Sequence, residues 1–324
     1  MKHDAFIKKF QVPEAAYRSI DKLFTKEEID FVCGMEKETF TEEDLADIDI
    51  ADGKQFLKNS YRRGIISMAN EDKGIYRVSD FYNRLDIFSI SETETWRSLP
   101  EDDRKAMDEW YFETYYAGLD PNPEIPPTGD EILPLDEVLS FIDRQDRPVY
   151  LNYCDCRSLS GACEMPTRTC ITYKNGINSF AHRGLSEPIN KERAKEIVRS
   201  ADRAGLVHTV QPNGICNCCS DCCYLFRGQR KRNSRGVWPK SSYVVEFDAA
   251  KCFRCGNCVK RCGFGVFSQE ETSSAEGKFP KRKKVSADTS KCIGCGLCVQ
   301  GCPAGALKLS ERRQSNSTSP VIPD

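Results

Sequence analysis

Cysteine is the residue type whose number and spacing point to chemistry in this chain. The sequence holds 18 cysteines in 324 residues. All but Cys33 fall between Cys154 and Cys302. Disulfides need an oxidising compartment, and the N-terminal Met1–Phe6 carries no apolar segment of secretory length. We therefore expect a cytoplasmic protein in which the crowded thiols are metal ligands.

The last eight cysteines form two copies of a C-x2-C-x2-C-x3-C pattern, within 251–262 and 291–302. This repeat resembles the motif of bacterial two-cluster ferredoxins. In that family three thiolates of each copy bind one [4Fe–4S] cluster, and the fourth crosses to the other cluster. The resemblance implies two ligand sets, Cys252, Cys255, Cys258 and Cys302 for the first cluster and Cys292, Cys295, Cys298 and Cys262 for the second.

The two copies differ directly after their last cysteine. The second copy continues with Cys302-Pro303, as the family does, whereas the first continues with Cys262-Gly263. Loss of the rigid proline predicts altered freedom or solvent access beside that cluster. Because solvent access tunes cluster potential, we expect the two clusters to differ in potential.

Nine further cysteines lie between residues 154 and 223 in two groups. A structural zinc ion uses four ligands and two cubane clusters would use eight, so nine thiols indicate more than one metal centre. We expect one or two further [4Fe–4S] clusters here; two structural zinc ions are the alternative, because closely spaced cysteines also suit tetrahedral zinc. The candidate ligands are Cys154, Cys156, Cys163, Cys170, Cys216, Cys218, Cys219, Cys222 and Cys223.

Five other side chains enter the sequence-based picture. His182 and His208 lie near these cysteines, but enough thiols exist without them, so we expect the histidines to support the ligands or the core. Arg157 and Arg168 would either offset cluster charge or be solvated. Cys33 is expected to be a small buried hydrophobe.

The elements that must hold these residues follow from capping and periodicity. Residues 1–130 are predicted to be mainly helical, with capped helix starts at Thr25 and Thr41, and helices over 53–63 and 101–116. Together with a hairpin over 65–78 this pattern resembles a winged-helix module. The breaker-rich segment 120–129 is predicted to be the linker that closes this domain.

In the middle of the chain, both groups of cysteines follow predicted strands. The strand 148–153 leads into Cys154, and the strand 206–210 precedes the second group. A helix over 191–204, capped by Asn190 and Gly205, lies between them; another helix is predicted over 135–143. If the strands pair in parallel through the 191–204 helix, both cysteine groups emerge at one edge of the sheet.

These elements predict an α+β protein with three domains. We expect a winged-helix-like docking domain at 1–130, an α/β cysteine-rich metal module at 131–240, a ferredoxin-like dicluster domain at 241–310 and a disordered tail at 311–324. The 39% hydrophobic content is enough for a packed core. No apolar run reaches the length of a membrane span.

The sequence favours an electron-transfer protein, more a non-catalytic subunit of an oxidoreductase complex than an enzyme itself. No dinucleotide-binding, P-loop or nucleophile-elbow motif is present. Several redox centres without a substrate-binding motif indicate a protein that carries electrons rather than a catalyst. We expect a flavoprotein or other oxidoreductase as partner, docked through the basic segments 230–232 and 281–284.

Two alternatives stay open. The first is a redox- or iron-responsive regulator whose N-terminal domain binds DNA through a helix bearing Lys54, Lys58, Arg62 and Arg63. An acidic run at 36–52 precedes that helix and would repel phosphates, and the net charge of −2 gives no footprint for nucleic acid. Nucleic acid is therefore not an expected partner. The second alternative is reductive chemistry at an open iron position in the middle module.

Overall fold

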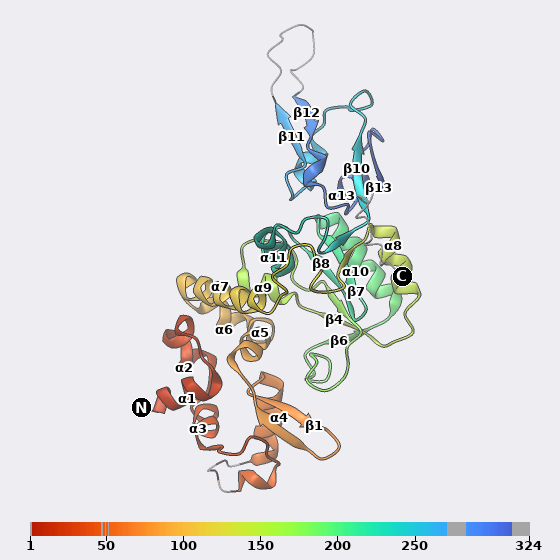
Figure 1. Cartoon of the computed structure of the whole chain (residues 1–324). Helices are drawn as coiled ribbons and strands as arrows, with labels where there is room; N and C mark the ends of the chain where they lie inside the picture. The colour runs from red at the N-terminus through yellow and green to blue at the C-terminus, as the bar shows by residue number, and fades with distance from the viewer. Residues whose placement is uncertain (1, 47, 49, 51, 271–282, 313–324) are drawn as a thin grey trace, which may run out of the picture.

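The computed structural model describes residues 2–46, 48, 50, 52–270 and 283–312. Its helices and strands follow one another as three regions (Figure 1). N-terminal helices lie at the lower left, a seven-stranded sheet with its helices lies in the centre, and two small two-stranded sheets lie at the top. The protein is thus a mixed helical and sheet structure of the α+β type. Most of the predicted tail, 313–324, lies outside the described residues.

The N-terminal region contains three of the four predicted helices and the predicted hairpin, together with four further α-helices among the described residues. The capping box at Thr25 and the helix over 53–63 are confirmed. The helix expected after Thr41 is wrong, since only a short 3-10 turn, η2, forms there; the alternating Asp and Ile residues that follow are poor helix formers. The elements are α1 (Lys2–Phe10), η1 (Glu14–Ser19), α2 (Ile20–Leu23), α3 (Lys26–Gly34), η2 (Glu43–Leu45), α4 (Gly53–Arg63), β1 (Ile66–Asn70), β2 (Ile75–Val78), α5 (Phe81–Ser91), α6 (Thr93–Ser98) and α7 (Glu101–Ala117).

The core of this region is aromatic and extends beyond residue 130. Phe6, Phe10 and Phe24 pack edge to face or stacked. The same cluster of buried residues includes Leu159 and Tyr224 from the middle of the chain. The helical region therefore shares its core with the segments that carry the first and second cysteine groups.

The central sheet has the strand order β6-β4-β5-β8-β7-β3-β9. Every pair is antiparallel except β3 with β9. The predicted helices over 135–143 and 191–204 are confirmed as α8 and α10, which pack on each other and on the sheet. The elements are β3 (Glu131–Ile132), α8 (Leu135–Asp143), β4 (Val149–Asn152), α9 (Asp155–Ser160), β5 (Cys170–Thr172), β6 (Glu187–Ile189), α10 (Lys191–Ala204), β7 (Val207–Gln211), β8 (Gly214–Cys218), α11 (Tyr224–Arg232) and β9 (Lys240–Ser241).

The predicted parallel pairing of the two strands around α10 is wrong. β5 and β8 lie between β4 and β7, and three successive antiparallel pairings make β4 and β7 run in opposite directions. β8, which was not predicted, returns from β7 through a tight turn and runs in the same direction as β4. The cysteine groups still converge, because they follow the ends of β4 and β8 rather than those of β4 and β7.

The C-terminal region is built from two antiparallel strand pairs and two short helices. Each helix begins after a left-handed glycine, Gly256 or Gly296. The elements are β10 (Tyr243–Phe247), α12 (Asn257–Arg261), β11 (Phe267–Glu270), β12 (Lys284–Ala287), η3 (Thr289–Lys291), α13 (Leu297–Gln300) and β13 (Leu307–Glu311). Among the helices described, none is long and apolar enough to cross a membrane.

Polar contacts tie α7 of the helical region to α11 of the central region. Arg227 donates to Asp108 at 2.8 Å and to Glu109 at 2.7 Å, and the Tyr224 hydroxyl donates to Asp108 at 2.7 Å. Arg227 also lies over the Phe112 ring. This joint lies one helical turn or less from Cys223, the residue that precedes α11.

The basic segment 230–232, expected to be a docking surface, is used inside the chain. Arg232 is buried and donates to the Ile125 carbonyl at 2.9 Å, within the predicted linker. Lys231 is paired with Glu113 of α7. These cations therefore join two regions of this chain. In the other predicted segment, Lys281 and Arg282 lie outside the described residues.

Candidate metal centres

The eight cysteines of the repeated motif line two separate pockets, one for each expected set. Cys252, Cys255, Cys258 and Cys302 line one pocket, together with Phe247 and Leu307. The second set, Cys262, Cys292, Cys295 and Cys298, lines another pocket. The structure thus brings each crossing cysteine to the three cysteines of the other copy. Thiols around a pocket are the donor set that an iron–sulfur cluster needs.

Backbone N–H groups point at the sulfur atoms in both copies. Arg254 donates its N–H to Cys252 Sγ at 3.3 Å, and Gly294 does the same to Cys292 Sγ at 3.3 Å. A side chain at position 294 would meet the Tyr243 carbonyl oxygen at 2.4 Å, and the φ of +72° there suits glycine. Such N–H donors stabilise negative charge on ligating sulfur.

The two pockets differ in their exposure to solvent. In the first set Cys255 is exposed, and the adjoining Phe253 is 59% exposed. In the second set Cys292 and Cys298 are buried, and burial raises the pKa of Cys295 to about 12. The first set therefore faces the surface and the second faces the interior.

The interior pocket is continuous with the central region. Its lining includes Cys219 and Ser220 beside the second cysteine set. Arg261 joins the two regions by donating to the Asp202 carbonyl at 3.0 Å and to the Leu297 carbonyl at 2.9 Å. The second set thus lies directly against the loop that carries the middle cysteines.

The missing proline after Cys262 has a steric reason. A Cβ at Gly263 would lie 2.5 Å from Ser220 Oγ and 2.9 Å from Ser220 Cβ. Neither alanine nor proline fits unless the 219–222 loop moves. Glycine at this position lets the C-terminal region approach the middle cysteines closely.

The nine middle thiols divide into six and three. Six of them form a closed ring in which each thiol shifts the pKa of the two beside it. They come from the ends of β4 and β8, the start of β5, and the starts of α9 and α11. In order around the ring the residues are Cys154, Cys156, Cys223, Cys218, Cys216 and Cys170.

Thiolate and thiol character alternate around this ring. Hydrogen bonds from Cys156 and Cys170 hold the pKa of Cys154 well below its usual value. Hydrogen bonds from Cys156 and Cys218 likewise lower the pKa of Cys223 to about 5. Cys154 and Cys223 precede the first turns of α9 and α11, and helix N-termini favour thiolates. The ring is therefore suited to supply anionic sulfur to a metal centre.

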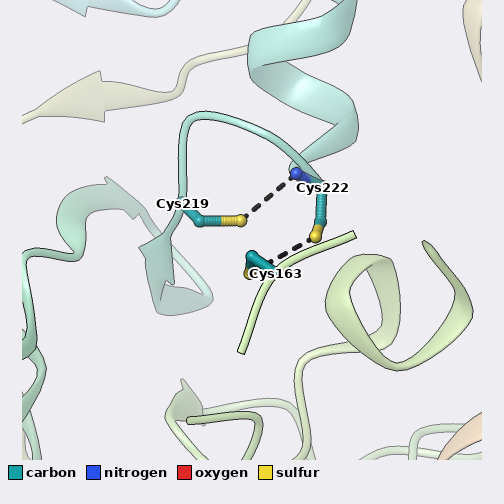
Figure 2. Close-up of side chains that lie close together, drawn as sticks. All are labelled: Cys163, Cys219 and Cys222. Carbon is teal, nitrogen blue, oxygen red and sulfur yellow. Dashed lines mark hydrogen bonds between the residues drawn. The ribbon is translucent and has the colours of Figure 1, made fainter. Parts of the chain in front are cut away.

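The other three thiols, Cys163, Cys219 and Cys222, form a compact group (Figure 2). Their sulfur atoms all lie within 4.8 Å of one another. The Cys222 thiol donates to Cys163 Sγ at 3.5 Å, and the Cys222 N–H donates to Cys219 Sγ at 3.3 Å. Hydrogen bonding from Cys222 lowers the pKa of Cys219 to about 5.

Arg157 lies between the two thiol groups. It is 2% exposed and donates to the Asn217 carbonyl at 3.1 Å and to Thr169 Oγ1 at 2.8 Å. Burial acts to lower its pKa, but negative charge on Cys154 and the neighbouring thiols outweighs burial and raises it. Of the two predicted roles, the structure favours charge compensation for Arg157. Arg168 is instead half-exposed and paired with Glu187.

The two histidine rings form hydrogen bonds to groups other than the cysteines. His182 bonds the Tyr61 hydroxyl at 2.7 Å and Glu71 at 2.8 Å. His208 Nδ1 lies 2.6 Å from Asn217 Oδ1. Supporting roles are therefore the better description. Cys33 is partly buried against the N-terminal core, as expected.

Sequence reasoning missed three polar residues beside the ring. Burial, and then the charge of Cys154, raises the pKa of Asp155 to about 7. Asp86 of α5 has a buried Oδ1 with no hydrogen-bond partner, and so has Asn152 at the end of β4. Asn152 and Asp155 line a pocket that reaches Cys170 and Cys216. The position of Asp155 between two cysteines was a usable signal; Asp86, 68 residues before Cys154, gave none.

In the regulator alternative, one helix was expected to bind DNA through four basic side chains. Two of these side chains form contacts within the protein. Arg63 pairs with Glu28 and Glu92, each at 2.6 Å. Arg62 donates to the Gly184 carbonyl of the central region at 2.6 Å. Two of the four basic side chains predicted to contact DNA therefore already have partners within the chain.

Comparison with known proteins identifies one segment. Residues 251–306 match the family model of the 4Fe-4S dicluster domain. No curated protein matches the chain. The segment with the repeated cysteine motif is therefore a ferredoxin-type domain that binds [4Fe–4S] clusters, and the chain is an iron–sulfur protein.

Proposed function

We propose that this chain is a multi-cluster electron-transfer protein of the cytoplasm, working as a subunit that connects a partner oxidoreductase to a further redox centre. One observation carries the proposal: the thiol groups are ordered from surface to interior. Cys255 is exposed, Cys292 and Cys298 of the second set are buried, and the pocket of that second set reaches Cys219 of the middle group. When bound, [4Fe–4S] clusters supply one-electron redox chemistry.

For the dicluster domain, the proposed ligands are the two sets that share pockets. Cys252, Cys255, Cys258 and Cys302 hold the outer cluster. Cys262, Cys292, Cys295 and Cys298 hold the inner one. The lining of the two pockets supports this division.

One further cluster is proposed for the six-thiol ring. Its thiols neighbour one another in a ring, and among the described residues no three of their sulfur atoms lie within 4.8 Å of one another. Such an open arrangement suits ligands placed around a multi-iron cluster. Buried Arg157 and the first turns of α9 and α11 supply positive potential for the thiolates.

The partner is proposed to dock at the outer set. Phe253 is 59% exposed there, and Lys251 and Arg254, its near neighbours in the sequence, are exposed as well. An apolar centre rimmed by cations fits an acidic surface of a flavoprotein or another oxidoreductase.

The decisive experiment is anaerobic purification from the native source, with metal analysis and identification of co-purifying chains. We expect about twelve irons per chain, from three [4Fe–4S] clusters, and an oxidoreductase among the co-purifying proteins. About eight irons, with zinc in the middle region, would remove the third cluster. Salt-sensitive DNA binding without a redox partner would overturn the electron-transfer role.

A second candidate, reductive chemistry at the ring, is favoured by the pocket beside it. The pocket reaches Cys170 and Cys216 and is lined by Asp155 and by Asn152, whose amide oxygen has no hydrogen-bond partner. Cyanide is a suitable probe for an accessible iron position. A cyanide-induced change in the electron paramagnetic resonance spectrum of the reduced protein, absent in Cys216→Ser, would favour catalysis. An unchanged spectrum would leave electron transfer as the remaining role of the ring.

A further inference from the structure

We propose that Cys163, Cys219 and Cys222 bind a single metal ion of the thiolate-preferring class, Zn²⁺ or Fe²⁺, separate from every iron–sulfur cluster. This inference goes beyond the electron-transfer role, because neither the ring nor the dicluster domain needs these three thiols. It divides the nine middle cysteines into two centres of different kinds.

The spacing of the sulfurs carries the argument. All three lie within 4.8 Å of one another, and the Cys163–Cys222 distance is 3.5 Å. Around a tetrahedral ion with metal–sulfur bonds of about 2.3 Å, neighbouring sulfurs lie about 3.8 Å apart. A cubane holds its ligating sulfurs farther apart, because four irons and four sulfides lie between them.

The same structure offers an internal comparison. Within the part of the chain that the structure describes, the cysteines of the dicluster domain form no group of three as compact as this one. Those cysteines surround pockets instead. Thiols that match a known cluster motif are thus spread out, whereas Cys163, Cys219 and Cys222 are drawn together.

The local backbone is also that of a small metal loop. Cys219 and Cys222 have the C-x2-C spacing common in zinc sites, and the Cys222 N–H points at Cys219 Sγ (Figure 2). Cys163 arrives from the loop that follows α9, which ends at the left-handed Gly161. Two distant segments therefore meet at the three sulfurs.

Charge and burial fit the same occupant. Cys219 and Cys222 are 4% and 0% exposed. Three thiolates around a divalent ion leave one net negative charge, and the guanidinium of Arg157, which is 2% exposed and within electrostatic reach of Cys219, supplies one positive charge. No fourth cysteine, histidine or carboxylate joins the compact group among the described residues. The fourth coordination position is thus for water or a small ligand.

The test compares Cys222→Ser and Cys163→Ser with Cys33→Ser in the full chain, purified anaerobically with its clusters. Metal analysis with native mass spectrometry is expected to show loss of one metal ion per chain in the first two variants. The cluster irons are expected to stay, and Cys33→Ser should match the parent. Loss of about four irons would assign these thiols to a cubane and overturn the proposal, and so would an unchanged metal content.

A spectroscopic measurement on the unaltered protein keeps the proposal testable if a variant fails to fold. X-ray absorption at the zinc edge is expected to show three sulfur neighbours at about 2.3 Å and one lighter neighbour. If the ion is iron, Mössbauer spectra would show one mononuclear high-spin site per chain. Absence of both signals would overturn the proposal, while intact dicluster resonances would leave the electron-transfer role standing.

Discussion

The dicluster segment and the six-thiol ring gather cysteines in opposite ways. In the dicluster segment, three of each set of four thiols lie within one C-x2-C-x2-C stretch, and only the fourth comes from elsewhere. In the ring, the thiols come from five elements of a seven-stranded sheet and its helices. The first arrangement depends on short loops, whereas the second depends on the pairing of whole strands. The ring should therefore be far more sensitive to changes elsewhere in the fold.

The largest expected effect comes from removing one ligand in each region. Cys298→Ser should lose about four irons and leave the strand pairing of the central sheet intact, because Cys298 lies on α13, outside that sheet. Cys216→Ser should also lose about four irons, and in addition lower the melting temperature of the central sheet. Iron analysis and calorimetry on the two variants measure this difference. Equal thermal effects would contradict the comparison.

The next effect concerns the buried cation between the thiol groups. Arg157→Met should cost about 3–5 kcal/mol of unfolding free energy, because it leaves anionic thiols and the Asn217 carbonyl without their partner. Loss of the positive charge should also lower the midpoint potential of the ring centre. Denaturant unfolding and potentiometric titration test both effects.

Arg168→Met is the matched control for that variant. Arg168 is half-exposed and paired with Glu187, so its loss should change stability by no more than about 1 kcal/mol. A potential shift of equal size in both variants would remove the special role of Arg157.

A smaller effect is expected at the joint between α7 and α11. Arg227→Met removes the bonds to Asp108 and Glu109 and should cost about 2 kcal/mol, because the cation is largely buried and bonded to charged partners. Chemical denaturation measures this cost. Arg193→Met, which breaks an exposed pair with Glu196 on α10, should have little effect.

The smallest effect is expected at the contact between the dicluster segment and the middle cysteines. Gly263→Ala should cost about 1 kcal/mol through its clash with Ser220. The double variant Gly263→Ala/Ser220→Gly should recover most of that loss, because the clashing side chain is gone. Gly176→Ala, where a Cβ meets nothing within 4 Å, is the control for glycine replacement itself. Failure of the rescue would place the cause in the backbone instead.

The same contrast explains what could be predicted from the sequence. The dicluster segment was readable because its spacing is local, and α8 and α10 were readable because their periodicity and caps are local. The pairing of β4 was not, because β8 is a short strand within a cysteine-rich run and lies beside β7 only through a tight turn. The division of nine thiols into six and three depends on that pairing. Composition alone gave the number of candidate ligands.

A pattern of charges does not by itself distinguish a docking surface from a joint within the chain. The segment 230–232 looked like a docking patch, yet Arg232 is buried and Lys231 is paired with Glu113. A run of basic residues at the end of a helix does not indicate whether its partner is another molecule or another part of the same chain.

One loop of the central region ties the pocket beside the ring to the N-terminal hairpin. Asn178 and Phe180 line the pocket beside Cys170 and Cys216, and Asn178 is held by hydrogen bonds to both the N–H and the carbonyl of Met68 on β1. One wall of this pocket is therefore held in place by the N-terminal region, which carries no predicted metal ligand. The access of small molecules such as dissolved oxygen to the ring should thus depend partly on a hairpin far from it in the sequence.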